Sequence, residues 1–191
     1  MILGIFGRAH HGKDAIGDYL INQHHFSKYK FADPLKQGAM AMFGFTYEQM
    51  YDEKLKEEID PFWGVTPRSV LQVLGTELLQ FGLQEHLPDF KFGRKIWVKR
   101  FQQWYESNKL AIAEWTNDCE FDVVISDVRF QHEVDIIKEM GGEVWKVVRP
   151  SIQSDDDHAS ESEMGALDAS KVFINDGTLI DLYSKVDEAL K

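Results

Sequence analysis

Cysteine and long hydrophobic runs are what this chain of 191 residues has least of. Its single cysteine, Cys119, cannot form an internal disulfide, which favours an intracellular protein. The apolar start at residues 1–6 is too short to span a membrane and shows no secretory cleavage pattern. The sequence therefore predicts a cytoplasmic protein with no membrane partner.

Positive charge is also scarce. The 21 lysines and arginines are outnumbered by 32 aspartates and glutamates, which gives a formal net charge of −11. This balance argues against binding to a nucleic acid polymer, because such proteins need clustered basic side chains. The 43% hydrophobic and 13% aromatic content excludes a disordered chain and suits one folded domain. Any phosphate group that the protein binds must therefore lie in a local basic pocket.

A glycine-bounded loop follows the apolar start. Residues 7–14 read GRAHHGKD, which matches the phosphate-binding pattern GxxxxGK except that Asp14 replaces the usual Ser or Thr. Gly7 and Gly12 permit backbone conformations in which successive N–H groups point inward, and the helix expected next adds its positive N-terminal end. Lys13 supplies a cation for the outer phosphates, and the Asp14 carboxylate can hold Mg²⁺ directly or through water. The stretch predicts a phosphate-binding loop; an ordinary strand-to-helix turn is the alternative.

A second motif lies at residues 121–127, a mainly apolar stretch that is expected to form a buried strand. The strand finishes at Asp127, and a carboxylate in this place is typical of the Walker B element that orders Mg²⁺ beside a phosphate loop. A helix is expected at 130–140 and another strand at 143–148, so the two strands form a βαβ unit in a parallel sheet. Further strands are expected at 1–6, 27–32 and 171–174.

The region between the second and third strands is expected to be helical. Asp33 is predicted to cap a helix that begins with Pro34, yet Asp33 and Lys36 are also ligand candidates because they follow the end of a strand. The helix that starts at the Thr66 cap has two arcs at helical spacing, an apolar one for the core and a polar one that suits a small polar ligand. An exposed polar surface is the alternative for the second arc. The apolar arc holds Val70, Leu71, Leu74, Leu78 and Phe81, and the polar arc holds Arg68, Gln72, Gly75 and Thr76.

Two other segments leave alternatives open. Residues 94–114 form a helical stretch with an aromatic stripe, which is more often core than a base-stacking surface. The acidic residues 155–163 are compatible with a metal cluster, a lid or a solvated loop. The stripe consists of Ile96, Trp97, Phe101 and Trp104.

The order of these motifs resembles the deoxynucleoside monophosphate kinases of tailed bacteriophages, a branch of the P-loop nucleotide kinases. The resemblance implies a three-layer α/β fold with a central parallel five-stranded sheet and helices on both faces. It implies a single domain, 1–191, with a core at 1–32 and 120–191, a helical substrate-binding insertion at about 33–119 and a lid-like segment at about 151–170. The matching stretches are 12–14, 31–36, 66–68, Leu71, Gln72, 75–77, 127–130, Glu133, 141–142, 148–150, 158–161 and 175–178.

The same resemblance implies transfer of the γ-phosphoryl group of ATP to a deoxynucleoside monophosphate, with Mg²⁺, to give the diphosphate and ADP. The implied catalytic residues are Lys13, Asp14, Asp127 and Arg129, of which Asp14 and Asp127 hold the metal. The implied ATP-binding residues are Gly7, Arg8, His11, Gly12, Lys13, Asp14, Ala15, Arg149, Asn175 and Gly177, with 175–178 near the adenine. The implied acceptor-binding residues are Asp33, Lys36, Arg68, Gln72, Thr76, Trp97 and Arg129.

Residues 151–170 depart from the family pattern because they contain no arginine. We expect Arg8 and Arg149 to do the work of the usual lid arginines. A P-loop kinase for another small phosphorylated acceptor, such as phosphomevalonate, and a non-catalytic nucleotide-binding module are the alternative functions. If the gene is a phage gene, the enzyme is expected in the cytoplasm of the infected host. The tryptophans Trp97, Trp104 and Trp115 leave room for a homodimer.

Overall fold

The fold is described from a computed structural model that covers residues 1–116, 120–152 and 167–191. Cys119 and the acidic residues 155–163 lie outside these described residues. The chain divides into two compact units, one made of residues 1–31 and 101–191 and the other of 32–100. No helix within the described ranges is long and apolar enough to cross a membrane.

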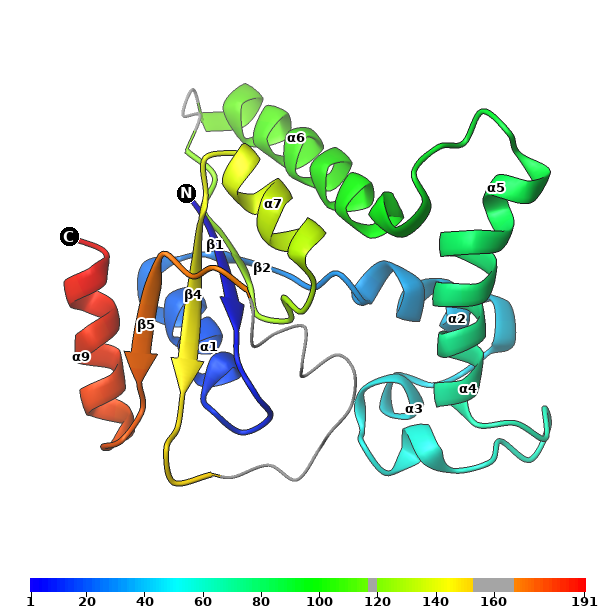
Figure 1. The fold of residues 1–191 in the computed structure, drawn as a ribbon, viewed down its shortest axis with the longest axis horizontal. Helices are drawn as coiled ribbons and strands as arrows, with labels where there is room; N and C mark the ends of the chain where they lie inside the picture. Colours follow the sequence, from blue (N-terminus) through cyan, green and yellow to red (C-terminus); the bar gives the residue numbers. More distant parts are fainter. Residues whose placement is uncertain (117–119, 153–166) are drawn as a thin grey trace. The chain divides into compact units, whose positions relative to one another are not determined.

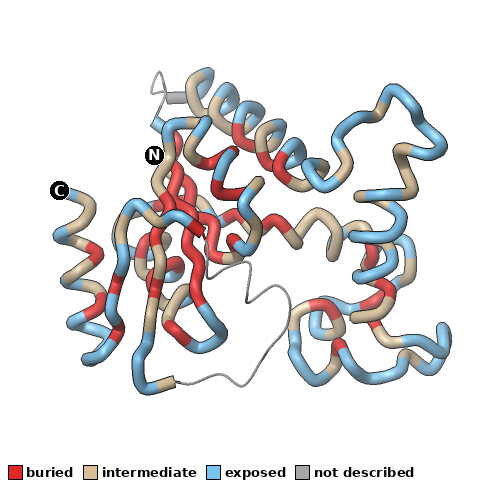
Figure 2. The backbone as a smooth tube through the Cα atoms, viewed as in Figure 1, coloured by how far each residue is buried: buried red, intermediate tan, exposed pale blue. Residues whose placement is uncertain are grey.

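The first unit is built on a five-stranded sheet in which every neighbouring pair is parallel (Figure 1). The order is β2-β3-β1-β4-β5, so the first strand of the chain lies in the middle. All five residues of β1 are buried, and Figure 2 shows that burial is concentrated in these central strands. The predicted parallel sheet of five strands is confirmed. The strands are β1 (Ile2–Phe6), β2 (Ser27–Tyr29), β3 (Val123–Ile125), β4 (Glu143–Val148) and β5 (Lys171–Ile174).

Helices cover both faces of this sheet, as predicted. Leu3 and Ile5 of β1 pack in one buried cluster with α1 (Lys13–His24) and α9 (Leu179–Ala189). Side chains alternate between the faces of a strand, so Gly4 faces the other way. A Cβ placed on Gly4 would lie 2.6 Å from Ile137 in α7 (Gln131–Glu139), which therefore packs closely on the opposite face.

The helix α6 (Ile96–Thr116) begins in the second unit and continues in the first. Phe101 is fully buried, and its ring lies 5.0 Å from that of Tyr29 in β2. Phe121, just before β3, adds a ring 5.5 Å from Trp104. The aromatic stripe is core at Phe101, as expected. The sheet unit therefore takes α6 from residue 101 onward, whereas the insertion was expected to run to about residue 119.

The regular elements of the second unit, residues 32–100, are all helices. Its core is a cluster of buried side chains from α2, α4 and the segment between them: Ala39, Phe45, Met50 and Val70. Thr66 caps α4, since its side chain accepts a hydrogen bond from the Ser69 N–H and Pro67 takes the first turn, as predicted. The elements are α2 (Asp33–Phe43), α3 (Tyr47–Tyr51), η1 (Leu55–Glu57), α4 (Pro67–Gln72), η2 (Val73–Gly82), α5 (Leu83–His86) and η3 (Gly93–Lys95).

The predicted apolar and polar arcs of the helix after Thr66 are wrong beyond residue 72, because η2 is a π-helix and not an α-helix. Each π turn takes more residues than an α turn, so positions spaced for an α-helix rotate away from their expected face. Leu78 and Phe81, expected in the core, are 51% and 50% exposed. Gly75, expected on the polar arc, is buried instead, and a Cβ there would lie 2.6 Å from Leu35 of α2.

Candidate active site

The loop between β1 and α1 has the backbone conformation that its glycines allow. The φ angles of Gly7, His10 and Gly12 are +150°, +61° and +111°. A Cβ on Gly7 would lie 2.3 Å from the Val147 carbonyl oxygen of β4, so only glycine fits at this position. The first intrahelical bond of α1 runs from the Ile16 N–H to the Gly12 carbonyl. The amides at the start of α1, including that of Ala15, therefore lack intrahelical acceptors, and they can bind an anion.

His11 and Asn175 hold this loop against the ends of two strands. The His11 ring is buried, and its Nδ1 lies 3.3 Å from the Val147 carbonyl oxygen, which can only accept. Asn175, just after β5, is 4% exposed and donates from Nδ2 to the His11 carbonyl over 2.9 Å. Asn175 therefore supports the loop between β1 and α1. The placement of residues 175–178 near the adenine, which the family resemblance implied, stays a prediction.

Lys13 lies at the first position of α1 and reaches back over the loop. Its Nζ donates to the Arg8 carbonyl oxygen over 2.7 Å. The next residue, Asp14, has a side chain that is 70% exposed, with one oxygen 3.7 Å from the Lys30 ammonium. Lys13 and Asp14 thus place one positive and one negative group at the N-terminus of α1.

The second predicted acidic residue lies at the same edge of the sheet. β3 neighbours β1, and the Ser126 hydroxyl that follows it lies 3.4 Å from an Asp14 carboxylate oxygen. A Cβ on Gly17 of α1 would lie 3.4 Å from that of Ser126, so the helix start packs against the end of β3. Asp127 comes next and accepts the Phe31 N–H over 3.0 Å.

The two carboxylates offer oxygen ligands of the kind that Mg²⁺ prefers. Among the described residues, no three His, Cys, Asp or Glu side chains gather into a metal cluster. Mg²⁺ at kinase sites is commonly held by one or two carboxylates together with substrate phosphates and water, so the pair Asp14 and Asp127 fits that ion.

Glu133 fixes the backbone that carries Arg129. Its side chain is 5% exposed, and its Oε2 accepts the N–H groups of Arg129 and Phe130 over 2.7 and 3.1 Å. Burial raises the pKa of Glu133 to about 8; the two backbone hydrogen bonds oppose this shift and the charge of Asp127 adds to it. Glu133 is one of the residues that carry the family resemblance, but no role was predicted for it. Its hydrogen bonds to the N–H groups of Arg129 and Phe130 depend on the folded backbone, which the composition does not reveal.

The loop between β1 and α1 lines a cavity of about 310 Å³. Arg8 comes from the loop and Arg149 from the end of β4, so the two predicted replacements for lid arginines line the same space. Lys146 adds a third cation, which no sequence motif indicated because it lies within a strand. Of the lid-like segment, residues 153–166 lie outside the described residues.

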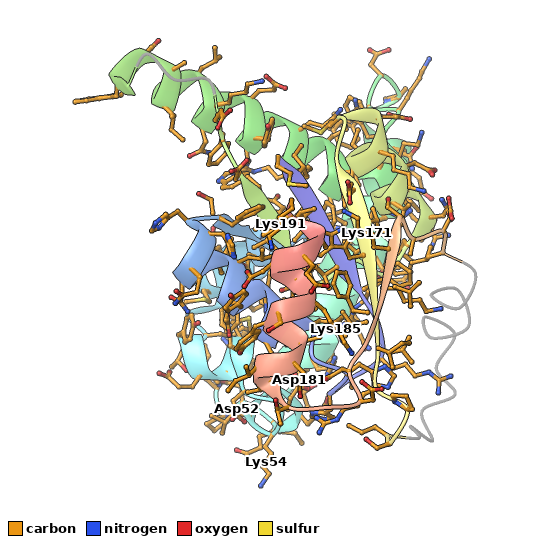
Figure 3. The ribbon with its side chains drawn as sticks, turned by 90° about the vertical axis from the view of Figure 1, so that its left-hand side faces the viewer. Asp52, Lys54, Lys171, Asp181, Lys185 and Lys191 are labelled. Atoms are coloured by element: carbon orange, nitrogen blue, oxygen red, sulfur yellow. The ribbon has the colours of Figure 1, made fainter. Side chains whose placement is uncertain are left out.

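The loop after β5 is shaped by its own contacts. A Cβ on Gly177 would lie 2.6 Å from the Asp181 carboxylate, which also accepts the Thr178 N–H to cap α9. Figure 3 shows Asp181 at the start of α9 with Lys185 one turn further along. The Lys185 ammonium donates to the Ile174 carbonyl over 2.7 Å. The Thr178 cap is confirmed.

In the second unit, Asp33 is the first residue of α2 and does not cap it. Its carboxylate instead accepts the Tyr51 hydroxyl over 2.9 Å. Burial, with the hydrogen bond to Asp33, raises the pKa of Tyr51. The Lys36 ammonium lies 4.0 Å from the centre of the Tyr51 ring. Tyr51 therefore contacts both predicted residues, and no sequence pattern indicated this.

Arg68 contacts two carboxylates, one at the end of η1 and one just before η1. Its Nε donates to Glu57 over 2.6 Å, and its Nη2 lies 3.5 Å from Glu53. Of the other predicted acceptor residues, Gln72 and Thr76 are exposed and Trp97 is half-buried.

Comparison with known proteins identifies the family. The family model described as deoxynucleotide monophosphate kinase matches residues 46–186. A protein of Acanthamoeba polyphaga mimivirus, described as a candidate deoxynucleotide monophosphate kinase, is 38% identical over 189 residues, which make up 97% of this chain and 94% of that protein. The deoxynucleotide monophosphate kinase of Enterobacteria phage T4 is 32% identical over 133 residues, 70% of this chain, and the match spans only 48% of the phage protein.

A solved structure, TT1252 from Thermus thermophilus, covers 100% of this chain and 96% of that chain at 18% identity, with a TM-score of 0.45. The family model and the sequence relatives decide among the functions that the sequence left open. The chain therefore belongs to the deoxynucleotide monophosphate kinase family, whose members are enzymes that phosphorylate deoxynucleoside monophosphates.

Proposed function

We propose that this enzyme transfers the γ-phosphoryl group of ATP to the 5′-phosphate of a deoxynucleoside monophosphate, with Mg²⁺ as cofactor, in the cytoplasm. The observation that carries the proposal is the contact between Ser126 and Asp14, because it brings the phosphate loop and the Asp127 segment to one edge of the sheet. Parallel α/β sheets bind their ligands at this edge.

In this proposal the donor triphosphate lies on the amides at the start of α1, with Gly7 and Gly12 shaping the loop. The Lys13 ammonium leaves the Arg8 carbonyl to contact the outer phosphates. Asp14 and Asp127 would hold Mg²⁺, which neutralises phosphate charge when it is bound.

Arg129 is proposed to stabilise the charge on the group in transfer. Its backbone is fixed by Glu133, so the position of its side chain is set from a buried anchor. Arg8 and Arg149 are proposed to hold the donor at the cavity beside the loop, since both line that cavity. Phosphoryl transfer needs such positioning and charge stabilisation more than covalent chemistry by the protein.

The acceptor is proposed to bind the second unit. Arg68 has the planar fork that suits a phosphate, and Asp33 and Lys36 are linked through Tyr51. Gln72, Thr76 and Trp97 are the remaining acceptor candidates. Asn175 and Gly177 support the loop and the start of α9, so their proposed effect on ATP binding is indirect.

A coupled assay of ADP release tests the proposal. We expect turnover with at least one of the four deoxynucleoside monophosphates and none with phosphomevalonate. Lys13→Met should reduce this turnover by at least about a hundredfold, since the outer phosphates lose their cation. Equal turnover of the Lys13→Met variant, or no turnover with any deoxynucleotide, would contradict the proposal.

A further inference from the structure

Three cationic side chains of the second unit act on one carboxylate, that of Glu53. The Lys56 Nζ lies 3.0 Å from its Oε1, and the Arg68 Nη2 lies 3.5 Å from its Oε2. The hydrogen bond from Lys56, with the charges of Lys56, Arg68 and Lys36, holds the pKa of Glu53 below its usual value, although burial opposes this effect. The cations come from α2, η1 and α4, which are separate elements.

The burial of the partners is unequal. The Lys56 side chain is 9% exposed, whereas the Glu53 side chain is 81% exposed. A buried ammonium needs a compensating anion, because its desolvation is costly. Here that anion approaches from the solvent side, where another anion could replace it without unpacking the unit.

Arg68 has donors left for such an anion. Its Nε is engaged by Glu57 over the shorter distance of 2.6 Å, while the Nη2 contact with Glu53 is long. A guanidinium carries five N–H donors in a rigid fork. Glu57 therefore orients the Arg68 side chain through Nε, whereas the Nη2 end of the guanidinium is held only by the long contact with Glu53.

We propose that Lys56, Arg68 and Lys36 form the subsite for the phosphate of the acceptor, and that Glu53 is a resident anion which this phosphate displaces. The inference rests on the proposed function and extends it: Lys56 becomes a phosphate contact, and Lys36, so far a general acceptor candidate, is assigned to the phosphate. A phosphate monoester carries up to two negative charges and three acceptor oxygens, so it suits three cations better than one carboxylate does.

Calorimetric titration of the whole protein tests the displacement. The ligands are the deoxynucleoside monophosphate with the highest turnover and the matching deoxynucleoside, which lacks the phosphate. Glu53→Gln keeps the shape and removes the competing charge, so the Kd of the nucleotide should fall about tenfold while nucleoside binding stays unchanged. Glu58→Gln, an equal charge change at an exposed glutamate nearby, should leave both values unchanged.

The cation is tested separately. Lys56→Met should raise the Kd of the nucleotide about tenfold and leave nucleoside binding unchanged, and Lys56→Arg should restore most of the affinity. Circular dichroism melting verifies that each variant is folded. An unchanged or higher nucleotide Kd in Glu53→Gln would overturn the inference, since Glu53 would then organise the cations and not compete for them. If the unmodified protein neither binds nor phosphorylates any deoxynucleotide, the proposed function fails instead.

Discussion

The Ser126 hydroxyl lies 3.4 Å from the Asp14 carboxylate, although 112 residues separate the two in the sequence. This contact joins the end of β3 to the first turn of α1. Because β3 and β1 are parallel neighbours, the groups that follow each strand share one edge of the sheet. The proposed site for ATP and Mg²⁺ depends on this relationship.

The phosphate loop should not tolerate a side chain at Gly7. Gly7→Ala combines a positive φ with a contact of 2.3 Å to the Val147 carbonyl, so we expect a loss of unfolding free energy of about 3 kcal/mol or more. Gly44→Ala is the matched control, because Gly44 has a φ of +70° and nothing lies within 4 Å of its added Cβ. It should cost only about 1 kcal/mol. Urea denaturation measures both; equal losses would show that the loop is not tightly held by β4.

Asn175 should support the phosphate loop and not read the adenine. Asn175→Ala removes the donor to the His11 carbonyl, leaves that buried group unpaired, and should lower the unfolding free energy by about 1–3 kcal/mol. The KM values for ATP and for GTP should then rise by a similar factor, because the loop contacts phosphates common to both. A rise confined to ATP would indicate that Asn175 contacts the base.

The stability of the enzyme should depend on pH through Glu133. Burial raises the pKa of this carboxyl in the folded state to about 8, so the folded protein binds the proton more tightly than the unfolded chain does. The resulting stabilisation is fully present below the ordinary pKa of about 4.5 and is lost as the pH rises through about 8. Glu133→Gln keeps an acceptor for the two N–H groups and removes the titration.

Urea denaturation between about pH 5 and about pH 8 measures this effect, because this range lies between the pKa of Glu133 in the unfolded chain and that in the folded protein. The unfolding free energy of the native protein, relative to that of Glu133→Gln, should fall as the pH rises, by at most about 1.4 kcal/mol per pH unit. A difference that stays constant across this range would show that Glu133 is ionised throughout.

Arg149 should carry part of the donor binding that lid arginines provide in similar kinases. Arg149→Ala should reduce turnover by about a hundredfold or more, since a charge-assisted contact to phosphate is lost. Arg100→Ala, at an exposed position in α6, removes the same charge and should have little effect. Near-normal activity of Arg149→Ala would contradict the assignment.

The sequence predicted those parts of the fold that are set by local patterns. All the strands except β2 lie in largely apolar runs, and the Thr66 and Thr178 caps precede their helices, so each could be found from a few neighbouring residues. The glycine loop was found for the same reason. Gly7 and Gly12 have the positive φ values that their spacing suggested.

The errors arose where distant contacts or helix type decide the outcome. The side chain of Asp33 bonds to Tyr51, 18 residues away, and does not cap α2. The π-helix after residue 72 turns Leu78 and Phe81 outward, and no simple periodicity in the sequence announces it. Glu53 and Lys56 were not singled out, and Glu133 was matched without a role, because the contacts of all three depend on burial and on partners in the folded chain.

The most direct measurement concerns the two carboxylates, Asp14 and Asp127. The protein is labelled with ¹³C at the aspartate carboxyls, and the Asp14→Asn and Asp127→Asn variants identify the two NMR signals. Addition of paramagnetic Mn²⁺ in place of Mg²⁺, together with a non-hydrolysable ATP analogue, should broaden both signals. Broadening of both is the predicted result, because the phosphate loop and the end of β3 meet at one metal–triphosphate complex. Broadening of only one of the two, or of neither, would contradict the account.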